Sequence, residues 1–362
     1  MRIVFICAAF YPSIGGVETH VLALSRELIK RGHNITVLTE SKSEYWHSKE
    51  TSDNVATKLK SVEESRHFVY SKLDQIDIYY FKFGQPSFFK KFRIWSSLLL
   101  NYKLIKSADV VHCHDVFVWY LPFRFLLIQK KVFTTFHGYE GRFPPIEKSI
   151  WIRKISERLS YGNICVGDFI KRWYGTKPDF VVYGGVSVVK NSELTIRNNE
   201  SKSRIKIVLI GRLAKDIGVQ IYADSLKRLK RDAFKFDFKA CGEGELRHEL
   251  EKYGEVLGFV KKTKEYIEKG DLIFASSYLT MLSIMQLGKP IFAVYTNPLK
   301  HDYLFSSPFA KHIYIYSSGK ELARGIKNYK PNLRRLKAAQ NFANSQTWAK
   351  LADTYEELWA KK

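Results

Sequence analysis

The chain has 362 residues, of which 45% are hydrophobic and 15% aromatic, and its formal net charge is +23 at pH 7. A chain of this length exceeds the usual size of a single core, so we expect two domains. The strong positive charge predicts an anionic partner such as a phosphorylated sugar or the headgroups of an anionic membrane. Nucleic acid is not expected as a partner, because the sequence contains no recognised RNA- or DNA-binding module.

Neither membrane crossing nor secretion is expected. The longest apolar stretch, residues 116–128, is interrupted by Pro122 and Arg124 and is shorter than the roughly twenty apolar residues that span a bilayer. The N-terminus lacks the layout of a signal peptide. The four cysteines lie in separate apolar runs without Cys-x-x-Cys spacing, which predicts reduced core residues in a cytoplasmic protein.

Residues 1–40 predict one strand–helix–strand unit of a parallel sheet. An apolar run at 2–7 is followed by Gly15 and Gly16, by apolar residues at helical spacing, and by a second apolar run at 35–38. Paired glycines at the start of a helix let backbone amides approach an anionic ligand. The alternative is that both glycines only form the turn.

Residues 41–77 are polar and show little periodicity, so we expect a loop excursion there, and residues 76–83 then predict a strand. Residues 88–106 combine aromatic and basic side chains and contain no acidic one. Such a helix suits a membrane interface, because rings enter the headgroup region while lysines pair with lipid phosphate. An ordinary helix that packs its rings into the core explains the same pattern, so both interpretations stay open.

Two further strands are predicted at 109–115 and 132–136. We expect His112 and His114 to point to opposite faces of the first strand, which leaves too few convergent ligands for a metal site. The second strand ends at His137. Ligands of open α/β sheets bind beyond the carboxyl ends of strands, so His137 is a candidate for chemistry, and the alternative is a purely structural histidine.

The second half of the chain repeats this organisation. Residues 188–204 are polar and predict a linker, after which an apolar run at 205–210 leads to Gly211, Arg212 and a helical pattern. Further strands are predicted near 234–240, 256–260, 272–275 and 290–294. The chain therefore predicts a second Rossmann-like sheet.

Several motifs together resemble the GT-B glycosyltransferases of the large retaining family 4. Gly15-Gly16-Val17-Glu18-Thr19-His20 resembles the N-terminal loop of that family, and Ser345–Leu351 leads into a segment that resembles its closing helix. The other matching segments are Gly211-Arg212-Leu213, Gly242-Glu243-Gly244-Glu245-Leu246-Arg247, Leu257-Gly258-Phe259-Val260 and Gly288-Lys289-Pro290. The resemblance spans nearly the whole chain and implies metal-independent transfer from a UDP- or GDP-linked sugar, with no further cofactor.

The resemblance also implies roles for individual residues. His137 and Arg212 are the implied catalytic residues, with His137 at the donor sugar and Arg212 at the diphosphate. Glu18, His20 and Glu140 are the acceptor-binding residues that we expect. The implied donor-binding residues are Gly15, Gly16, Gly211, Arg212, Lys215, Gly258, Phe259, Val260, Tyr278, Leu279, Thr280 and Ser283. No metal ligand is expected.

The chain departs from the family pattern at two places. The family usually carries a pair of glutamates around the donor helix, whereas this chain has Ser283 at the second position and a preceding loop too short for the first. The lysine that usually follows the arginine loop is replaced by Ile217, and Lys215 lies two residues earlier. Without these groups, binding of a diphosphate would depend on Arg212, on Lys215 and on the amides at a helix start.

We therefore expect an α/β protein of the GT-B class, with two Rossmann-like domains facing across a cleft. The expected divisions are an acceptor domain at 1–187, a linker at 188–204, a nucleotide-sugar donor domain at 205–342, and a C-terminal helix at 343–362 that packs back on the first domain. The expected function is retaining sugar transfer to a glycan or lipid-linked acceptor by a cytoplasmic protein peripheral to an anionic membrane. The alternative is a non-catalytic protein that binds nucleotide sugars or glycans, because both usual glutamates are absent.

Overall fold

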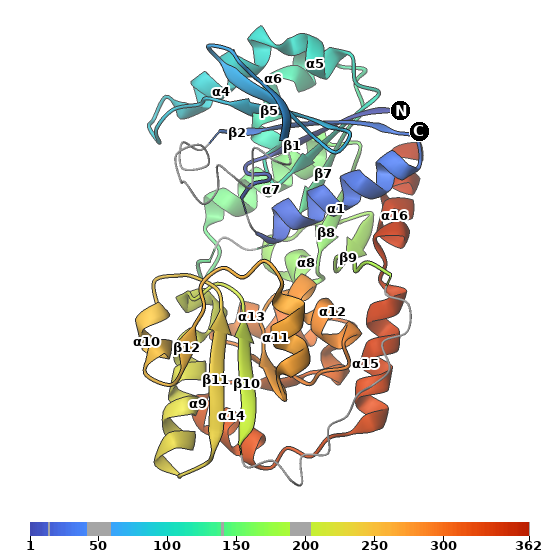
Figure 1. Ribbon diagram of the computed structural model, residues 1–362. Helices are drawn as coiled ribbons and strands as arrows, with labels where there is room; N and C mark the ends of the chain where they lie inside the picture. Colours follow the sequence, from blue (N-terminus) through green and yellow to red (C-terminus); the bar gives the residue numbers. More distant parts are fainter. Residues whose placement is uncertain (14, 42–58, 139–140, 189–203, 362) are drawn as a thin grey trace. The chain divides into compact units, whose positions relative to one another are not determined.

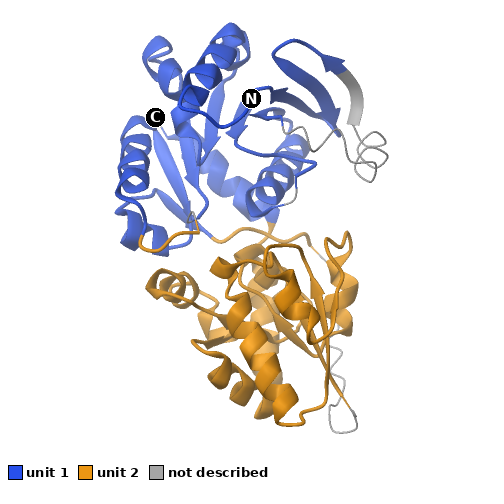
Figure 2. Cartoon of the chain, turned by 90° about the vertical axis from the view of Figure 1, so that its left-hand side faces the viewer, with its two compact units in different colours: residues 1–139, 145–182, 348–362 blue, residues 140–144, 183–347 orange. Residues whose placement is uncertain are grey.

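The computed structural model describes residues 1–13, 15–41, 59–138, 141–188 and 204–361. The chain forms two compact units, which Figure 2 colours separately. Unit 1 consists of residues 1–139, 145–182 and 348–362, and unit 2 consists of residues 140–144 and 183–347. The predicted linker at 188–204 lies outside the described residues except at its two ends.

Unit 1 is built on a nine-stranded sheet (Figure 1). In spatial order its strands are β3 (Leu59–Glu64), β4 (Phe68–Leu73), β5 (Ile76–Phe81), β2 (Asn34–Glu40), β1 (Arg2–Cys7), β6 (Val110–His114), β7 (Val132–Phe136), β8 (Gly162–Val166) and β9 (Phe180–Val182). β4 is antiparallel to β3 and β5, and the other neighbouring strands are parallel. β6, β7 and β8 are buried along their whole length, as expected for parallel strands covered on both faces.

Helices cover both faces of this sheet. They are α1 (Gly16–Lys30), α4 (Lys90–Leu100), α5 (Tyr102–Lys106), α6 (Phe117–Leu126), α7 (Glu147–Leu159), α8 (Phe169–Tyr174) and α16 (Trp348–Ala360). Leu24 of α1 and Tyr355 of α16 share one hydrophobic core with Phe5 of β1. Ile94 of α4 and Phe117 of α6 belong to a second core, which uses the alternate residues of β1. The sheet therefore lies between an α1–α16 layer and an α4–α6 layer.

The prediction of a loop at residues 41–77 is wrong for residues 59–77. Residues 59–64 and 68–73 form β3 and β4, which extend the sheet beyond β5, while residues 42–58 lie outside the described part of the chain. In β4 the residues Val69, Ser71 and Leu73 are buried and alternate with more exposed ones. A serine on the buried side and the polar neighbours obscure this alternation in the sequence.

Unit 2 contains a parallel sheet of six strands. In spatial order they are β12 (Glu255–Val256), β11 (Phe236–Cys241), β10 (Ile205–Ile210), β13 (Leu272–Phe274), β14 (Ile291–Val294) and β15 (Tyr314–Tyr316). The helices are η2 (Lys215–Ile217), α9 (Val219–Arg231), α10 (Arg247–Glu251), α11 (Thr263–Lys269), α12 (Tyr278–Gln286), α13 (Pro298–Phe305), η3 (Ala310–His312), α14 (Gly319–Lys327) and α15 (Leu333–Ser345). Two Rossmann-like units with parallel sheets confirm the predicted α/β class.

Candidate functional site

Four histidines gather at the carboxyl ends of three neighbouring strands in unit 1. His20 lies in α1 after β1, His112 and His114 lie in β6, and His137 follows β7. The rings of His20 and His137 are 4.7 Å apart between centroids, and the rings of His114 and His137 are 5.1 Å apart. His114 Nδ1 and His137 Nε2 share a hydrogen bond of 2.8 Å. The structure thus brings together the predicted residues His20 and His137.

The expectation that His112 and His114 point to opposite faces of their strand is wrong. Their rings are stacked with centroids 5.1 Å apart. Side chains alternate along a strand, so residues two positions apart share a face. Even so, the described residues contain no group of three or more His, Cys, Asp or Glu side chains that could hold a metal ion.

A chain of hydrogen bonds connects these histidines to the C-terminal helix α16. Trp359 Nε1 lies 3.0 Å from His112 Nδ1, and His112 Nε2 lies 2.7 Å from Thr135 Oγ1. Thr135 Oγ1 lies 2.8 Å from the hydroxyl of Tyr355, which lies 2.9 Å from His20 Nε2.

The donor and acceptor in each of these hydrogen bonds follow from the indole of Trp359, because an indole N–H can only donate. His112 therefore accepts at Nδ1 and, as a neutral ring, donates from Nε2 to Thr135. Thr135 then donates to Tyr355, and Tyr355 donates to Nε2 of His20. Helix α16 thus fixes which nitrogen of His20 carries the proton.

Burial keeps these imidazoles neutral. Desolvation lowers the pKa of His20, His112 and His114 well below the ordinary value for histidine, and nearby histidines lower it further. Desolvation, assisted by the positive charge of Arg153, lowers the pKa of His137 to about 3. His137 is therefore a neutral hydrogen-bonding group at physiological pH.

The loop that carries His137 is held from two sides. The backbone N–H of His137 donates to Oδ1 of Asp115 at 2.9 Å. Arg153 of α7 donates to the carbonyl of Gly138, and its guanidinium lies 4.0 Å from the ring centroid of Tyr174. Glu140, the third predicted acceptor residue, lies outside the described residues.

At the start of α1, the predicted residue Glu18 folds back over the glycine pair. Ser13 Oγ donates to Glu18 Oε1 at 3.3 Å, and a Cβ built on Gly15 would lie 2.3 Å from Glu18 Oε2. A side chain at position 15 would displace the flexible Glu18 carboxylate, whereas a Cβ on Gly16 would meet nothing within 4 Å. Glu18 thus occupies the helix start at which we expected the glycine amides to bind the donor.

In unit 2 the loops after β10 and β11 pack closely around Arg212. A Cβ on Gly242 would lie 1.8 Å from the carbonyl oxygen of Gly211, and one on Gly244 would lie 2.4 Å from that of Leu213. Arg212 itself is paired with Asp216 at 2.7 Å, and its side chain is 65% exposed. Arg212, the predicted phosphate-binding arginine, therefore also forms an ion pair at the surface.

The other predicted donor residues of unit 2 lie at the same edge of the sheet. Gly258 follows β12 and bridges to Gly242, and the neighbouring Phe259 is 61% exposed. Tyr278, Leu279 and Thr280 open α12 directly after β13, and Lys215 lies in η2 after β10. The carboxyl ends of four neighbouring strands, β12, β11, β10 and β13, therefore carry the predicted set.

Some side chains at the start of α12 turn away from solvent. The ring of Tyr278 is stacked on that of Tyr303 at 4.0 Å, and the Tyr278 backbone N–H donates to the Tyr303 hydroxyl at 3.0 Å. Ser283, which stands where the family has a glutamate, is exposed and donates to the carbonyl of Leu279 at 3.0 Å. Ser283 is too short to reach as far as a glutamate would.

Sequence reasoning missed the roles of His112, His114, Thr135, Tyr355 and Trp359 in the hydrogen-bond network, and that of Tyr303 beside α12. The spacing of Tyr355 and Trp359, four residues apart in a helical pattern, indicates that both lie on one helix face. No local pattern connects them to β6 or β7, because these contacts join residues more than two hundred positions apart.

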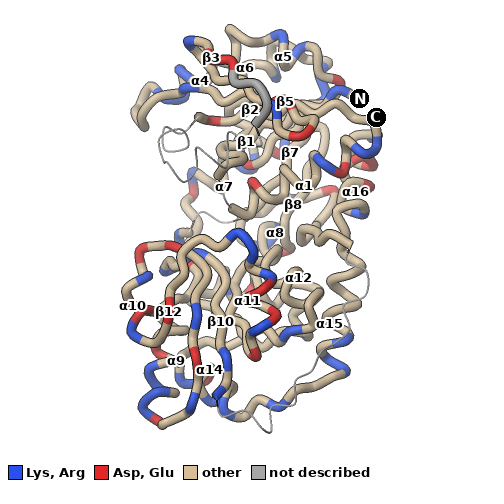
Figure 3. The backbone as a smooth tube through the Cα atoms, viewed as in Figure 1, with Lys and Arg blue, Asp and Glu red and all other residues tan. Residues whose placement is uncertain are grey.

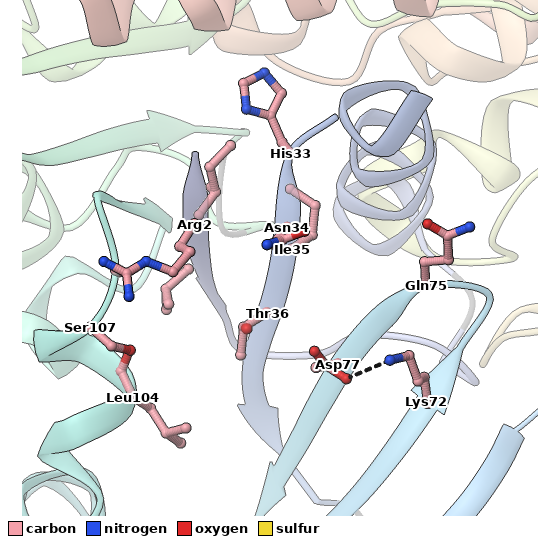
Figure 4. Close-up of a pocket in the computed structure, with 13 residues that line it drawn as sticks. Arg2, His33, Asn34, Ile35, Thr36, Lys72, Gln75, Asp77, Leu104 and Ser107 are labelled. Carbon is pink, nitrogen blue, oxygen red and sulfur yellow. Dashed lines mark hydrogen bonds and ion pairs between the residues drawn. The ribbon is translucent and has the colours of Figure 1, made fainter. Parts of the chain in front are cut away.

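A cavity of about 530 Å³ in unit 1 lies at the opposite edge of the sheet, where β1 and β2 begin (Figure 4). Arg2 and Asn34, the first residues of these strands, contribute to its lining, and Lys72 pairs with Asp77 there at 3.4 Å. Because ligands of parallel α/β sheets bind at the carboxyl edge, this cavity is not the candidate site.

Comparison with known proteins finds similarity to glycosyltransferases. Residues 14–188 match a family model described as Glycosyltransferase Family 4. The phosphatidylinositol N-acetylglucosaminyltransferase GPI3 subunit of Saccharomyces cerevisiae is 23% identical over 319 residues, covering 76% of this chain and 63% of the yeast protein. The chain thus spans less than two thirds of the length of the curated relatives that it matches.

Solved structures resemble the whole chain. A glycosyltransferase from Rickettsia africae has a TM-score of 0.68 at 13% identity and covers 100% of both chains. HepE of Anabaena in complex with UDP has a TM-score of 0.67 at 12% identity and covers 99% of both chains. The catalytic domain of starch synthase IV from Arabidopsis thaliana, bound to ADP and acarbose, has a TM-score of 0.65 at 15% identity, covering 99% of this chain and 98% of that one.

These solved structures show that the chain has the GT-B fold, and the comparisons as a group show its similarity to glycosyltransferases. Residues 14–188 are similar to glycosyltransferase family 4.

The buried histidines predict a fall in stability below about pH 6.5. Their pKa values are lowered in the folded state, so the unfolded chain binds more protons and is stabilised relative to the folded chain as the pH falls through the ordinary histidine pKa. Each such histidine lowers the free energy of unfolding by about 1.4 kcal/mol per pH unit below that value. Urea denaturation at intervals between pH 5.5 and 7.5 measures this slope.

A His112→Asn variant removes one of these groups and should reduce the slope, whereas His248→Gln should not, since the His248 side chain is 63% exposed. If His112→Asn leaves the slope unchanged, the conclusion that the buried histidines are neutral in the folded state is wrong.

The arrangement around Arg212 makes a second prediction. Arg212→Ala should weaken binding of UDP or GDP by about 1.5–3 kcal/mol, the range for charge-assisted hydrogen bonds. Asp216→Asn should have the opposite effect, because it removes a competing negative charge from the arginine. Calorimetric titration measures both affinities, and an Arg212→Ala variant with wild-type affinity would exclude the assignment.

Proposed function

We propose that this protein transfers a sugar, with retention of configuration, from a nucleotide-diphosphate sugar to a glycan or lipid-linked acceptor. The observation that carries the proposal is the set of anion-binding elements at the carboxyl edge of the unit 2 sheet. There, the guanidinium of Arg212, the glycine turns at Gly242 and Gly244, and the start of α12 lie after neighbouring strands. Guanidinium groups and helix starts both stabilise phosphate charge.

Stabilising the departing diphosphate is the main electrostatic task of such a transfer. In our proposal the side chain of Arg212 and the amides of α12 perform this task, so the reaction proceeds without a metal ion. The UDP and ADP bound in the similar structures of HepE and starch synthase IV support a nucleotide diphosphate as the ligand. Retention follows from the resemblance to family 4.

His137 is the proposed contact to the transferred sugar. One nitrogen of its ring is engaged by His114 at 2.8 Å, and its backbone is fixed by Asp115. The ring is therefore oriented before any ligand binds, and a neutral imidazole can exchange hydrogen bonds with sugar hydroxyls without a charge penalty.

We further propose that the acceptor lies at a membrane surface. Residues 88–106 form the end of a loop followed by α4 and α5. Ile94, Leu98 and Ile105 face the core, while Phe88 is 86%, Phe89 65% and Phe92 57% exposed. Trp95 packs against the core and donates to the carbonyl of Val118 at 2.8 Å, so the exposed aromatic face is shorter than the sequence suggests.

Other exposed apolar side chains of unit 1 lie on the same layer of helices. Phe125, Leu126 and Ile128, at the end of α6, are 65–68% exposed, and Lys130 Nζ donates to the carbonyl of Lys106 at 2.9 Å. The sequence has no acidic residue at 82–108 or at 116–139, and basic residues lie along α4 and α5 (Figure 3). Exposed rings and lysines without carboxylates suit an anionic lipid surface.

This proposal describes a peripheral membrane protein on the cytoplasmic side. None of the helices in the described part of the chain has the length and apolar character needed to cross a bilayer. The yeast relative is named as a phosphatidylinositol N-acetylglucosaminyltransferase subunit, which supports a lipid-linked acceptor for this chain.

A transfer assay tests the enzymatic part of the proposal. The protein is incubated with UDP- and GDP-linked sugars, UDP-N-acetylglucosamine among them, and with phosphatidylinositol and polyprenyl-phosphate glycolipids in vesicles. Mass spectrometry detects the product, and NMR of the new linkage reports retention. His137→Ala should lower turnover about ten- to a hundredfold, as expected when a hydrogen bond to the transition state is lost, and should change the affinity for the bare nucleotide little.

His67→Ala, a change of an exposed histidine on another loop, is the matched control and should transfer at the wild-type rate. A folded His137→Ala variant with wild-type turnover would return His137 to a structural role, and nucleotide binding without any transfer would favour a binding protein.

Vesicle co-sedimentation tests the membrane surface. Lys90 is paired with Glu40 at 2.5 Å, and Arg93 donates to the carbonyl of Gln85 at 2.6 Å, so neither is the best choice for substitution. The exposed residues Lys91, Lys103 and Lys106 are better suited, and each contributes on the order of 1 kcal/mol near an anionic leaflet. The triple change to glutamine should greatly reduce pelleting with phosphatidylserine vesicles.

The wild type should not pellet with neutral vesicles, and high salt should release it from anionic ones. Changing Phe88 and Phe92 to serine should also reduce pelleting, whereas Phe305→Ser, at an aromatic residue of unit 2 that is 49% exposed, should not. Equal pelleting by all variants would show that α4 does not bind the membrane and is an ordinary core helix.

A further inference from the structure

In unit 1, one ring nitrogen of a buried histidine lacks a hydrogen-bond partner. His114 is 1% exposed, and its Nδ1 shares the 2.8 Å hydrogen bond with Nε2 of His137. Its other ring nitrogen, Nε2, is buried and forms no hydrogen bond within the described residues. Buried polar atoms of folded proteins almost always have a partner, so this nitrogen calls for a physical explanation.

The described surroundings of His114 offer no acceptor to its Nε2. The rings of His112 and Tyr355 are tilted by only 30° and 22° from the plane of the His114 ring, so they cover its faces. Their polar atoms are engaged in the hydrogen-bond chain to α16. Phe5, a hydrocarbon ring, approaches at 73° with centroids 5.1 Å apart. His114 is therefore packed among rings that cannot accept a proton from it.

Both rings of the His114–His137 pair are neutral at physiological pH, because burial lowers their pKa values. A neutral imidazole carries one proton, so the shared hydrogen bond has only two possible arrangements. In the first, His114 Nδ1 donates to His137 Nε2, and the buried Nε2 of His114 is a bare acceptor. In the second, His137 Nε2 donates to His114 Nδ1, and the buried Nε2 of His114 carries an N–H without an acceptor.

The first arrangement is favoured, because it uses the N–H of His114 in the one hydrogen bond that is available. A buried N–H without an acceptor is rarer in proteins than an acceptor with an unused lone pair. His137 then accepts at Nε2 and, being neutral, carries its own proton on Nδ1. His137 is half-buried, and its Nδ1 forms no hydrogen bond within the described residues, so this N–H can donate to a ligand.

We infer that His114 is a positioning residue that holds the proton of His137 on Nδ1, so that His137 meets the transferred sugar as a hydrogen-bond donor. Because Nδ1 is protonated and Nε2 accepts from His114, His137 cannot take a proton from the acceptor and does not act as a general base. The inference rests on the proposed contact between His137 and the sugar and adds the direction of that hydrogen bond.

Long-range proton–nitrogen correlation spectra of the protein with isotope-labelled histidine test the inference directly. Protonated and bare ring nitrogens resonate in separate regions, so the spectra show which nitrogen of each neutral histidine carries the proton. At neutral pH the signals of His137, assigned by their loss in His137→Ala, should show a protonated Nδ1 and a bare Nε2. A protonated Nε2 on His137 overturns the inference and leaves the proposed function intact.

Two substitutions of similar size separate the hydrogen bond from the packing. An asparagine side chain can place its amide nitrogen where Nδ1 of the histidine lies and can donate from there, whereas leucine cannot. His114→Asn should therefore keep the proton of His137 on Nδ1, while His114→Leu should allow the second tautomer. His248→Leu, at a side chain that is 63% exposed, is the matched control and should leave the His137 signals unchanged.

Transfer kinetics test whether His114 acts through His137. His114→Leu should lower turnover about two- to tenfold, the loss expected for one neutral hydrogen bond, and should leave the affinity for bare UDP unchanged. His114→Asn should retain most of the turnover. In the His137→Ala background, His114→Leu should have no further effect, because no ring is left to position.

Circular dichroism and the thermal midpoint report the folded state of each variant. Should His114→Leu fail to fold, the wild-type spectra and the turnover of His114→Asn still decide the inference. Wild-type turnover in a folded His114→Leu variant, or an equal loss with and without the His137 ring, makes His114 a structural residue and overturns the inference alone. A wild type that transfers no sugar overturns both the proposed function and the role of His114 in it.

Discussion

Strands of a parallel sheet all run in one direction, so the segments that follow them meet at a single edge. The chemistry of both units depends on this constraint. In unit 2 it brings Arg212 and the start of α12 together, although they lie far apart in the sequence. In unit 1 it does the same for His20, His114 and His137, which follow or end β1, β6 and β7. Glycines at Gly242 and Gly244 then allow neighbouring loops to approach at backbone distance.

The two units differ in the charge of the side chains at their sheet edges. Unit 2 places Arg212 at its sheet edge, where the guanidinium is exposed and paired with Asp216. Unit 1 places four imidazoles at the equivalent edge and keeps them neutral by burying them. Neutral imidazoles hold fixed hydrogen-bond directions, which suits the recognition of uncharged hydroxyl groups, while a cationic edge suits phosphate.

The sequence predicts most of this fold, because its strongest signals are local. Apolar runs at 2–7, 132–136 and 205–210, each followed by glycines or a helical pattern, correspond to β1, β7 and β10. β4 was missed because Ser71 sits on its buried side.

The site was predicted less completely than the fold. The motifs made His20 and Arg212 candidates, and the position at the end of a predicted strand made His137 one. His112 and His114 were predicted on opposite faces of β6, but residues two positions apart in a strand lie on the same face. Tyr303 and Tyr355 have no local signal at all, since their significance comes from contacts between elements that only the folded chain brings together.

The position of α16 has a consequence for the order in which the chain folds during synthesis. The core of unit 1 joins Phe5 and Leu24, near the beginning of the chain, to Leu351, Tyr355 and Trp359. All of unit 2 between residues 183 and 347 leaves the ribosome before those last side chains do. Domains usually fold in the order in which they are made. Here unit 2 has all its residues first, and the face of the unit 1 sheet that α1 shares with α16 stays partly uncovered until α16 arrives.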